Sequence, residues 1–182
     1  NKVIVSYADY GNANSATVVV GTVSGTSISF GSPVSTGGQY VDWTSVSYDS
    51  TNDKIVVAYS TGGVGKAIVG TISGTSVSFG TAVNFAGGNN AEEITSVYDS
   101  NSGKIVISYK DTSASNYGKS VVGTVSGTSI SFGSAVTFNS AATSDLVSTF
   151  DSTNNKVILA YKDGGNSFYG AAIVGDVSGT SI

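Results

Sequence analysis

The chain has 182 residues, of which 40% are hydrophobic and 11% charged, and eight basic and twelve acidic residues give a net charge of −4. This balance, without a basic run, excludes nucleic acid as an expected partner, and no apolar run is long enough for membrane insertion. Cysteine, histidine and methionine are absent, which excludes disulfides, zinc knuckles and nucleophile–histidine pairs and suits an exposed life outside cells.

The phrase Val-Ser-Gly-Thr-Ser-Ile, or a near copy of it, occurs four times, starting at Val23, Ile72, Val125 and Val177. Successive starts lie 49, 53 and 52 residues apart. A period of about fifty residues predicts one supersecondary unit that is used repeatedly. The predicted units are a partial one at 1–38, full ones at 39–88 and 89–140, and a partial one at 141–182. We expect them to be a window of a longer array.

Four strands are predicted in the full unit at 39–88, and they cover residues 40–49, 54–59, 67–72 and 75–85. The first is rich in Val, Tyr, Trp and Thr, and Asn52-Asp53 after it suits a tight turn with positive φ. The second and third are apolar on both faces, which predicts that other sheets cover them on both sides. Gly70 indicates a close backbone approach and Gly80 a bulge.

No segment has helical periodicity, so each unit is predicted to be a four-stranded antiparallel meander in an all-β protein. Such a sheet has two apolar faces and cannot bury both alone, so neighbouring units must cover them. Tandem meanders with this period are typical of β-propeller blades. β-Sandwich-like modules and a stacked-sheet fibre are the alternatives.

The phrase at 67–80, Ala-Ile-Val-Gly-Thr-Ile-Ser-Gly-Thr-Ser-Val-Ser-Phe-Gly, is followed after a spacer by Tyr-Asp-Ser-x-x-x-Lys-Ile-Val. Together these resemble the repeats of long proteins in phages of ocean bacteria and of similar bacterial surface proteins. The resemblance covers nearly the whole chain. It implies a virion appendage or an extracellular adhesive or structural protein, and it supplies no catalytic residues.

The loop between the second and third strands varies most from unit to unit. Asp9, Asp111 and Asp163 open it in three units, and their oxygens together with nearby Asn oxygens could hold Ca²⁺. The simpler interpretation is that each Asp fixes its own turn through backbone N–H groups. Seven residues of these loops are candidate ligand contacts: Tyr10, Asn12, Asn116, Tyr117, Asn166, Phe168 and Tyr169. Rings beside amides are typical of sugar-binding surfaces, whereas the alternative is that the rings cap the core.

Two further acidic features are expected to be structural. The Asp of Tyr-Asp-Ser, at Asp49 and Asp99, and of Phe-Asp-Ser, at Asp151, precedes a tight turn and is expected to cap it. Glu92 and Glu93 are adjacent, and neighbours on a strand point to opposite faces, which argues against a glycosidase pair.

The sequence therefore predicts a non-enzymatic protein, outside cells or on a virion surface, that is structural or adhesive. As a viral appendage segment or filament-forming subunit it would associate with itself through repeat faces or strand edges. The alternative is a carbohydrate-binding β-propeller that contacts a cell-surface glycan. No cofactor is expected apart from the Ca²⁺ considered above.

Overall fold

The computed structural model describes residues 1–88 and 90–182, and no α-helix is present among them. Strands joined by turns make up the fold, with one short 3₁₀ helix, η1 (Gly164–Asn166). The prediction of an all-β protein built from antiparallel meanders is confirmed. Asn89, the predicted first residue of the third unit, lies outside the described residues. Within the described part of the chain, no helix is long and apolar enough to cross a membrane.

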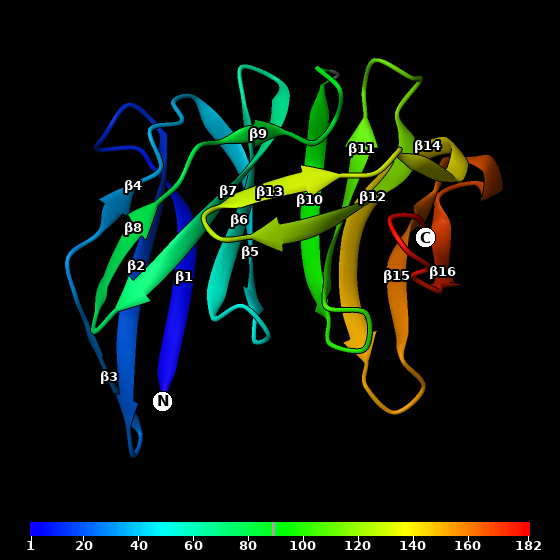
Figure 1. The fold of residues 1–182 in the computed structure, drawn as a ribbon. Helices are drawn as coiled ribbons and strands as arrows, with labels where there is room; N and C mark the ends of the chain where they lie inside the picture. The colour runs from blue at the N-terminus through cyan, green and yellow to red at the C-terminus, as the bar shows by residue number, and fades with distance from the viewer. Residues whose placement is uncertain (89) are drawn as a thin grey trace.

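The strands follow one another in four meanders (Figure 1). The first contains β1 (Lys2–Asp9), β2 (Ser15–Ser24), β3 (Ser27–Phe30) and β4 (Val34–Ser35). The second contains β5 (Val41–Asp49), β6 (Lys54–Thr61), β7 (Val64–Ser73), β8 (Ser76–Phe79) and β9 (Val83–Asn84). The third contains β10 (Ala91–Asp99), β11 (Lys104–Asp111), β12 (Tyr117–Ser126), β13 (Ser129–Phe132) and the first half of β14 (Val136–Asp151). The fourth contains the second half of β14, β15 (Lys156–Asp163) and β16 (Tyr169–Gly175).

The predicted fourth strand is two short strands that pair with the same neighbour. In the second unit, β8 pairs with β7 opposite Gly70, and β9 pairs with it opposite Ala67. Gly80 lies between them and donates its N–H to the carbonyl of Val69 at 2.9 Å. The predicted interruption is therefore present, as a break in the strand.

The third and fourth units share one strand. The first half of β14 pairs with β12 and its second half with β15, so one continuous strand runs from the third unit into the fourth and hydrogen-bonds to both. The second and third units are separated at this point, where Gly87 and Gly88 have φ of 62° and 86°. No glycine stands between Gly133 and Gly164, so the strand continues without such a break.

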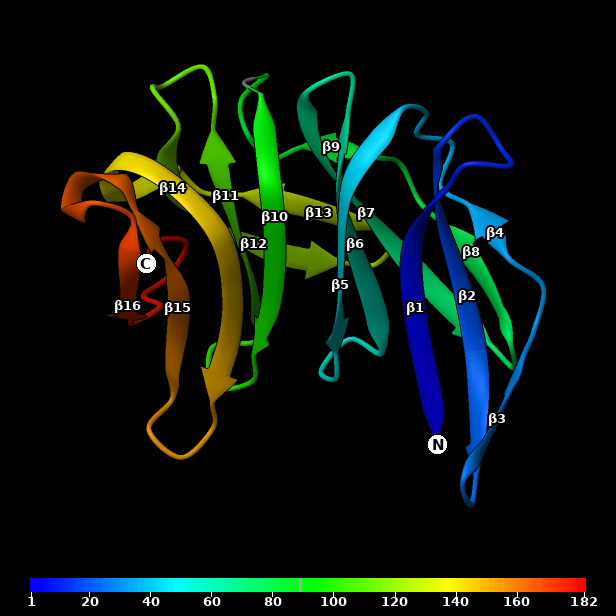
Figure 2. The same ribbon diagram turned by 180° about the vertical axis from the view of Figure 1, so that it is seen from behind.

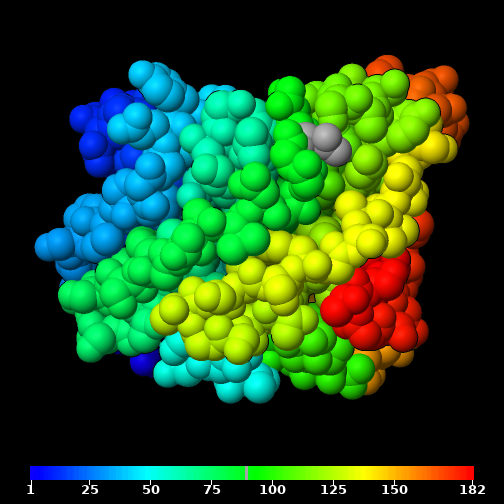
Figure 3. All heavy atoms as spheres, turned by 45° about the horizontal axis from the view of Figure 1, so that its top comes forward, coloured from blue at the N-terminus to red at the C-terminus, as the bar shows by residue number. Residues whose placement is uncertain are grey.

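The meanders pack face to face in chain order, and Figure 3 shows the blue N-terminal segments on one side of the molecule and the red C-terminal residues on the other, with green and yellow segments between them. Alternate residues of β6 point to different neighbours: Ile55, Val57 and Tyr59 pack against the first unit, and Val56 and Ala58 against the third. All five are buried. The two-sided cover predicted from apolar runs is thus confirmed for this strand, and each pair of neighbouring units encloses its own core cluster.

The repeated phrase forms the contact between units. Its glycine makes the turn with positive φ, at 58° for Gly25 and 61° for Gly74. The apolar residue after it, Val77 or Ile130, is buried against the preceding unit. The backbone carbonyl of its threonine lies very close to the preceding unit. A β-carbon added at Gly80 of the second unit would collide with the carbonyl oxygen of Thr128 of the third. The second, third and fourth copies of the phrase make this same contact, through Thr75, Thr128 and Thr180, which accounts for its recurrence.

Gly70 shows why its position also recurs. A β-carbon there would lie 2.7 Å from Ile55 and 3.0 Å from the ring of Phe79. Gly21 and Gly123 hold the rings of Phe30 and Phe132 in the same way. The close approach predicted for this position is therefore made by the phenylalanine of the unit's own fourth strand, whose ring packs directly against the glycine.

Candidate functional surfaces

The variable loops between second and third strands gather at one end of the stack, the upper end in Figure 1. The structure therefore brings the predicted ligand residues to one end, although each set belongs to a different unit. Among the rings of the predicted ligand residues, Tyr10 and Tyr169 are the most exposed, at 80% and 67%. Phe168, Asn12, Asn116 and Asn166 are also exposed, and Tyr117 is half-buried.

Hydrogen bonds within the loops account for the positions of Asp9, Asp111 and Asp163. The carboxylates accept N–H groups two residues ahead, from Gly11 at 3.1 Å, Ser113 at 3.0 Å and Gly165 at 2.9 Å. This is the turn geometry expected of Asp. Among the described residues no three acidic side chains converge as they would to hold a cation.

Asp111 is more buried than Asp9 and Asp163 and makes stronger polar contacts with its neighbours. It is buried, and Lys119 Nζ lies 2.7 Å from Oδ2 while Ser113 Oγ donates to Oδ1 at 2.6 Å. Burial alone would raise the pKa of Asp111, but the contacts with Lys119 and Ser113 outweigh it and hold the pKa below its usual value. Burial, with a contribution from the charge of Asp111, raises the pKa of nearby Tyr109 to about 12.

A cavity of about 490 Å³ opens at the same end, beside the shortest loop. Gln39, Tyr40, Tyr59 and Lys66 contribute to its lining. Tyr40 was predicted to begin a strand, but its φ is 54° and its ring is exposed. The shortened loop at 60–65 is the sequence signal for this cavity, because a loop of fewer residues leaves the space above Tyr59 open.

The prediction that Glu92 and Glu93 point to opposite faces is wrong. Lys110 Nζ lies 2.8 Å from Glu92 Oε2 and 3.3 Å from Glu93 Oε1. The pairing of β10 with β11 shifts register between Glu92 and Thr95, and Glu93 has φ of 49°. This bulge turns the second carboxylate towards the first. Burial would lower the pKa of Lys110, but the two carboxylates raise it overall.

The Tyr-Asp-Ser aspartates cap their turns as expected. Asp49 Oδ1 accepts the N–H groups of Thr51 and Asn52, both at 3.0 Å. Asp99 and Asp151 make the equivalent bonds in their own turns. The hydrogen bonds to the turn explain why the residue type recurs.

The first strands of neighbouring units, β5, β10 and β14, are neighbours along one side of the molecule (Figure 2), and hydroxyl groups connect them. Ser96 Oγ lies 2.9 Å from Ser45 Oγ and 2.8 Å from Ser47 Oγ. Thr95 Oγ1 lies 2.7 Å from Ser148 Oγ at the next junction. Serine and threonine side chains make these contacts between the first strands, whereas the rings of Phe85 and Phe132 meet between the outer strands.

The two end units leave apolar faces uncovered. On the first unit, Ile28 and Phe30 are 50% and 53% exposed, although their counterparts Val77 and Ile130 are buried. On the last unit, Ala160, Ala172 and Val174 are exposed, and Val174 reaches 62%. The two surfaces are called here the leading face and the trailing face, defined by these five residues.

Comparison with known proteins adds no relative: no family model and no curated protein matches the chain.

Proposed function

We propose that this chain is a non-enzymatic structural or adhesive array, located outside cells or on a virion, whose copies join head to tail. The observation that carries the proposal is the equivalence between the trailing face and buried surfaces inside the chain. Strand pairing aligns Ala160 and Ala172 with Ala58 and Ala67 of the second unit. The latter two are fully buried against the third unit.

The leading face is the matching half of such a junction. Phe30 occupies the position that Phe132 has in the third unit, where the ring packs against the second unit. Ile28 likewise corresponds to Ile130. A trailing face followed by a leading face would therefore repeat a junction that the chain already makes within itself. Such a contact is heterologous, so it produces either a closed ring or an open filament.

The fold class extends to β-propeller blades under this proposal. Hydroxyl contacts lie between the first strands, whereas the larger rings of Phe85 and Phe132 lie between the outer strands. Small groups between units at one edge and large groups at the other bring the units closer together at the first edge. Each unit is then rotated relative to the one before it, so a row of units curves around an axis. A row of sandwich-like modules or a flat stacked-sheet fibre would instead need equal spacing at both edges.

Self-association is tested with one charged residue on each face. Wild-type protein is expected to give species larger than the monomer in sedimentation velocity as concentration rises. Phe30→Asp and Ala160→Asp are each expected to be monomeric, because each loses one face. When the two are mixed, the intact trailing face of the first meets the intact leading face of the second. The mixture should therefore form a one-to-one complex and nothing larger.

Ser50→Asp, in the exposed turn after β5, is the matched control and should assemble like wild type. A wild-type chain that remains monomeric at about millimolar concentration would overturn the proposal. A mixture of the two variants that remains monomeric would overturn the head-to-tail geometry.

The alternative function is carbohydrate binding at the loop end. Exposed Tyr10, Phe168 and Tyr169 beside exposed amides favour it, since flat rings cover sugar faces while amides bond hydroxyls. The cavity beside Tyr40 offers a second position for a sugar. A glycan array distinguishes these two binding positions. A signal that is lost in Tyr169→Ala comes from the loop of the fourth unit, and a signal that is lost in Tyr40→Ala comes from the cavity. No signal on the array argues against this function.

A further inference from the structure

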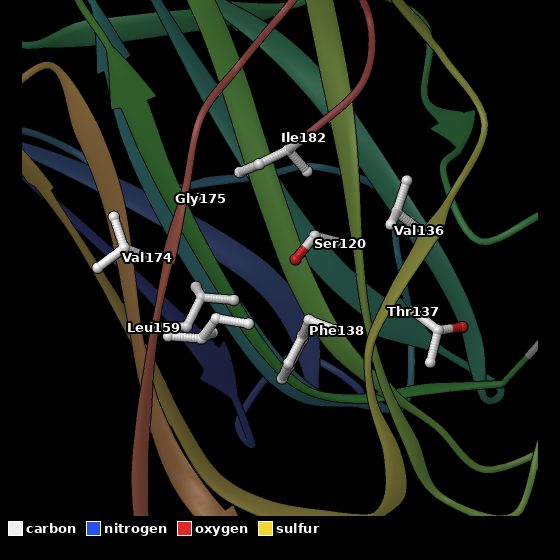
Figure 4. Close-up of a pocket in the computed structure, with 9 residues that line it drawn as sticks. Ser120, Val136, Thr137, Phe138, Leu159, Val174, Gly175 and Ile182 are labelled. Carbon is white, nitrogen blue, oxygen red and sulfur yellow. The ribbon is translucent and has the colours of Figure 1, made fainter.

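The junction between the first and second units differs from the two that follow it. At the later junctions, Phe85 and Phe138 occupy equivalent positions, each directly after a residue that pairs with β7 or β12. Each ring packs edge-on against a tyrosine of the next unit, with centroids 5.3 Å apart for Tyr109 and 5.2 Å apart for Tyr161. Figure 4 shows Phe138 among the mainly apolar side chains that line the cavity at the last junction.

Thr36 stands at this position in the first unit. Its N–H donates to the carbonyl of Ala16 at 2.8 Å, as the N–H of Phe85 donates to that of Gly65 at 3.1 Å, so the two backbones are equivalent. A threonine side chain leaves space that a phenyl ring fills at the later junctions. The cavity of about 490 Å³ beside Tyr40 lies there, and Thr36 is part of its lining.

The cavity is also lined by a lysine whose counterpart in the next unit is neutralised. Lys66 and Lys119 occupy the same position on β7 and β12, opposite the closing tyrosine of the second strand. Lys119 Nζ lies 2.7 Å from Asp111 Oδ2, but the same register places Thr61 where Asp111 stands. Lys66 is half-buried and takes part in none of the ion pairs between described residues.

The other groups around Lys66 suit a polar ligand with a flat face. The ring of Tyr40 is 69% exposed, and Gln39 and Thr61 contribute an amide and a hydroxyl group to the lining. No acidic side chain is among the described residues that line the cavity. A half-buried ammonium group attracts an anion more strongly than one in open water, and a carboxylate is the partner that the equivalent lysine already has.

We propose that this cavity binds a sugar that carries a carboxylate, such as a hexuronic acid. The carboxylate pairs with Lys66 in the place that Asp111 takes beside Lys119, and the sugar ring lies against Tyr40. The inference rests on the alternative function above, carbohydrate binding, and names the class of sugar for one of its two positions. The lining residues belong to the first and second units and to neither the leading nor the trailing face, so the site does not depend on self-association.

The probe is trigalacturonate, and its control is the methyl ester of the same trisaccharide, which has the same rings without the charge. In isothermal titration calorimetry of the full chain at low salt, the acid should bind at least about tenfold more tightly than the ester, because a charged hydrogen bond is stronger than a neutral one. Lys66→Gln should lose this preference. Lys54→Gln, which removes the same charge at the far end of β6, should keep it.

Thr61→Asp gives a second test that leaves Lys66 unchanged. It places a carboxylate where Asp111 stands in the third unit, so the lysine is paired within the chain and the preference for the acid should disappear. Thr61→Asn is the matched control, because it has nearly the same size without the charge, and it should keep the preference.

The outcomes separate this inference from the function on which it rests. Equal binding of the acid and the ester, or an undiminished preference for the acid in Lys66→Gln, overturns the choice of an acidic sugar but leaves carbohydrate binding standing. Failure of both trisaccharides to bind overturns carbohydrate binding at this cavity as well. A tetraglutamate peptide that binds as tightly as trigalacturonate would show that the site selects carboxylates without regard to the sugar, and would overturn the assignment to a sugar.

Discussion

Gly133 lies directly against the backbone carbonyl of Thr180, a residue of the following unit. A β-carbon at Gly133 would collide with that oxygen, and Gly80 has the same relationship with Thr128. The glycines at the end of the fourth strands are therefore required by the distance between units. Their own φ angles are not in the left-handed region, so any residue could adopt the backbone conformation.

Gly133→Ala is expected to lower the free energy of unfolding by about 1–3 kcal/mol, because the added methyl group must displace a backbone carbonyl. Urea denaturation measures this change. Gly170→Ala is the matched control, since no atom lies within 4 Å of a β-carbon there. Equal stability of the two variants would show that the units are not in close contact at this position.

Asp99→Ala is expected to destabilise the protein by about 2 kcal/mol, because the turn loses the hydrogen bonds that it makes with the buried carboxylate of Asp99. Asp99 Oδ1 accepts the N–H groups of Asn101 and Ser102 at 2.8 and 3.2 Å, and Oδ2 accepts Ser102 Oγ–H at 2.6 Å. Thermal and urea unfolding would report the loss. Asp42→Ala, at an exposed position of β5, should change stability by less than about 0.5 kcal/mol. A similar effect of both substitutions would contradict the capping role.

Acid should weaken the protein through Asp111. The pKa of this group is lower in the folded state than in the unfolded chain, where it is about 3.9. Its contribution to stability is therefore complete above about pH 4 and is lost as the pH falls through the folded-state pKa. Asp111→Asn should be less stable than the wild type at pH 7, and the difference should shrink below about pH 4. Urea unfolding at a series of pH values tests this, and a difference that is constant with pH would contradict it.

Phe85→Ala and Phe30→Ala compare one residue type in two settings. Phe85 is buried and its ring lies 5.3 Å from that of Tyr109 in the next unit, whereas Phe30 is half exposed on the leading face. The first substitution should cost about 3–5 kcal/mol, and the second much less in the monomer. Differential scanning calorimetry at low concentration gives both values. A small effect at Phe85 would mean that neighbouring units contribute little to one another's stability.

Much of the architecture could be predicted because the repeat carries it. The apolar runs of β6 and β7 predicted cover on both sides, and Gly70 predicted a close approach that the ring of Phe79 makes. Asp53, which turns with positive φ, also lies where turn chemistry placed it. Each of these signals is local or recurs in several units.

Features that occur in a single unit could not be predicted in this way. The convergence of Glu92 and Glu93 depends on a left-handed backbone at Glu93, and glutamate has no particular preference for that conformation. The cavity beside Tyr40 depends on one shortened loop in one unit. The hydroxyl contacts of the first strands were also missed, because Ser and Thr are as common on exposed strands as between packed ones.

Those hydroxyl contacts have a further consequence for how such a chain changes over time. A serine or threonine Oγ both donates and accepts, so Ser96 needs no dedicated partner and bonds Ser45 and Ser47 alike. A unit cut out, or copied and inserted, would find acceptable neighbours on either side without compensating substitutions. Whole units can thus be gained or lost during evolution while the contacts between neighbouring first strands remain hydroxyl contacts.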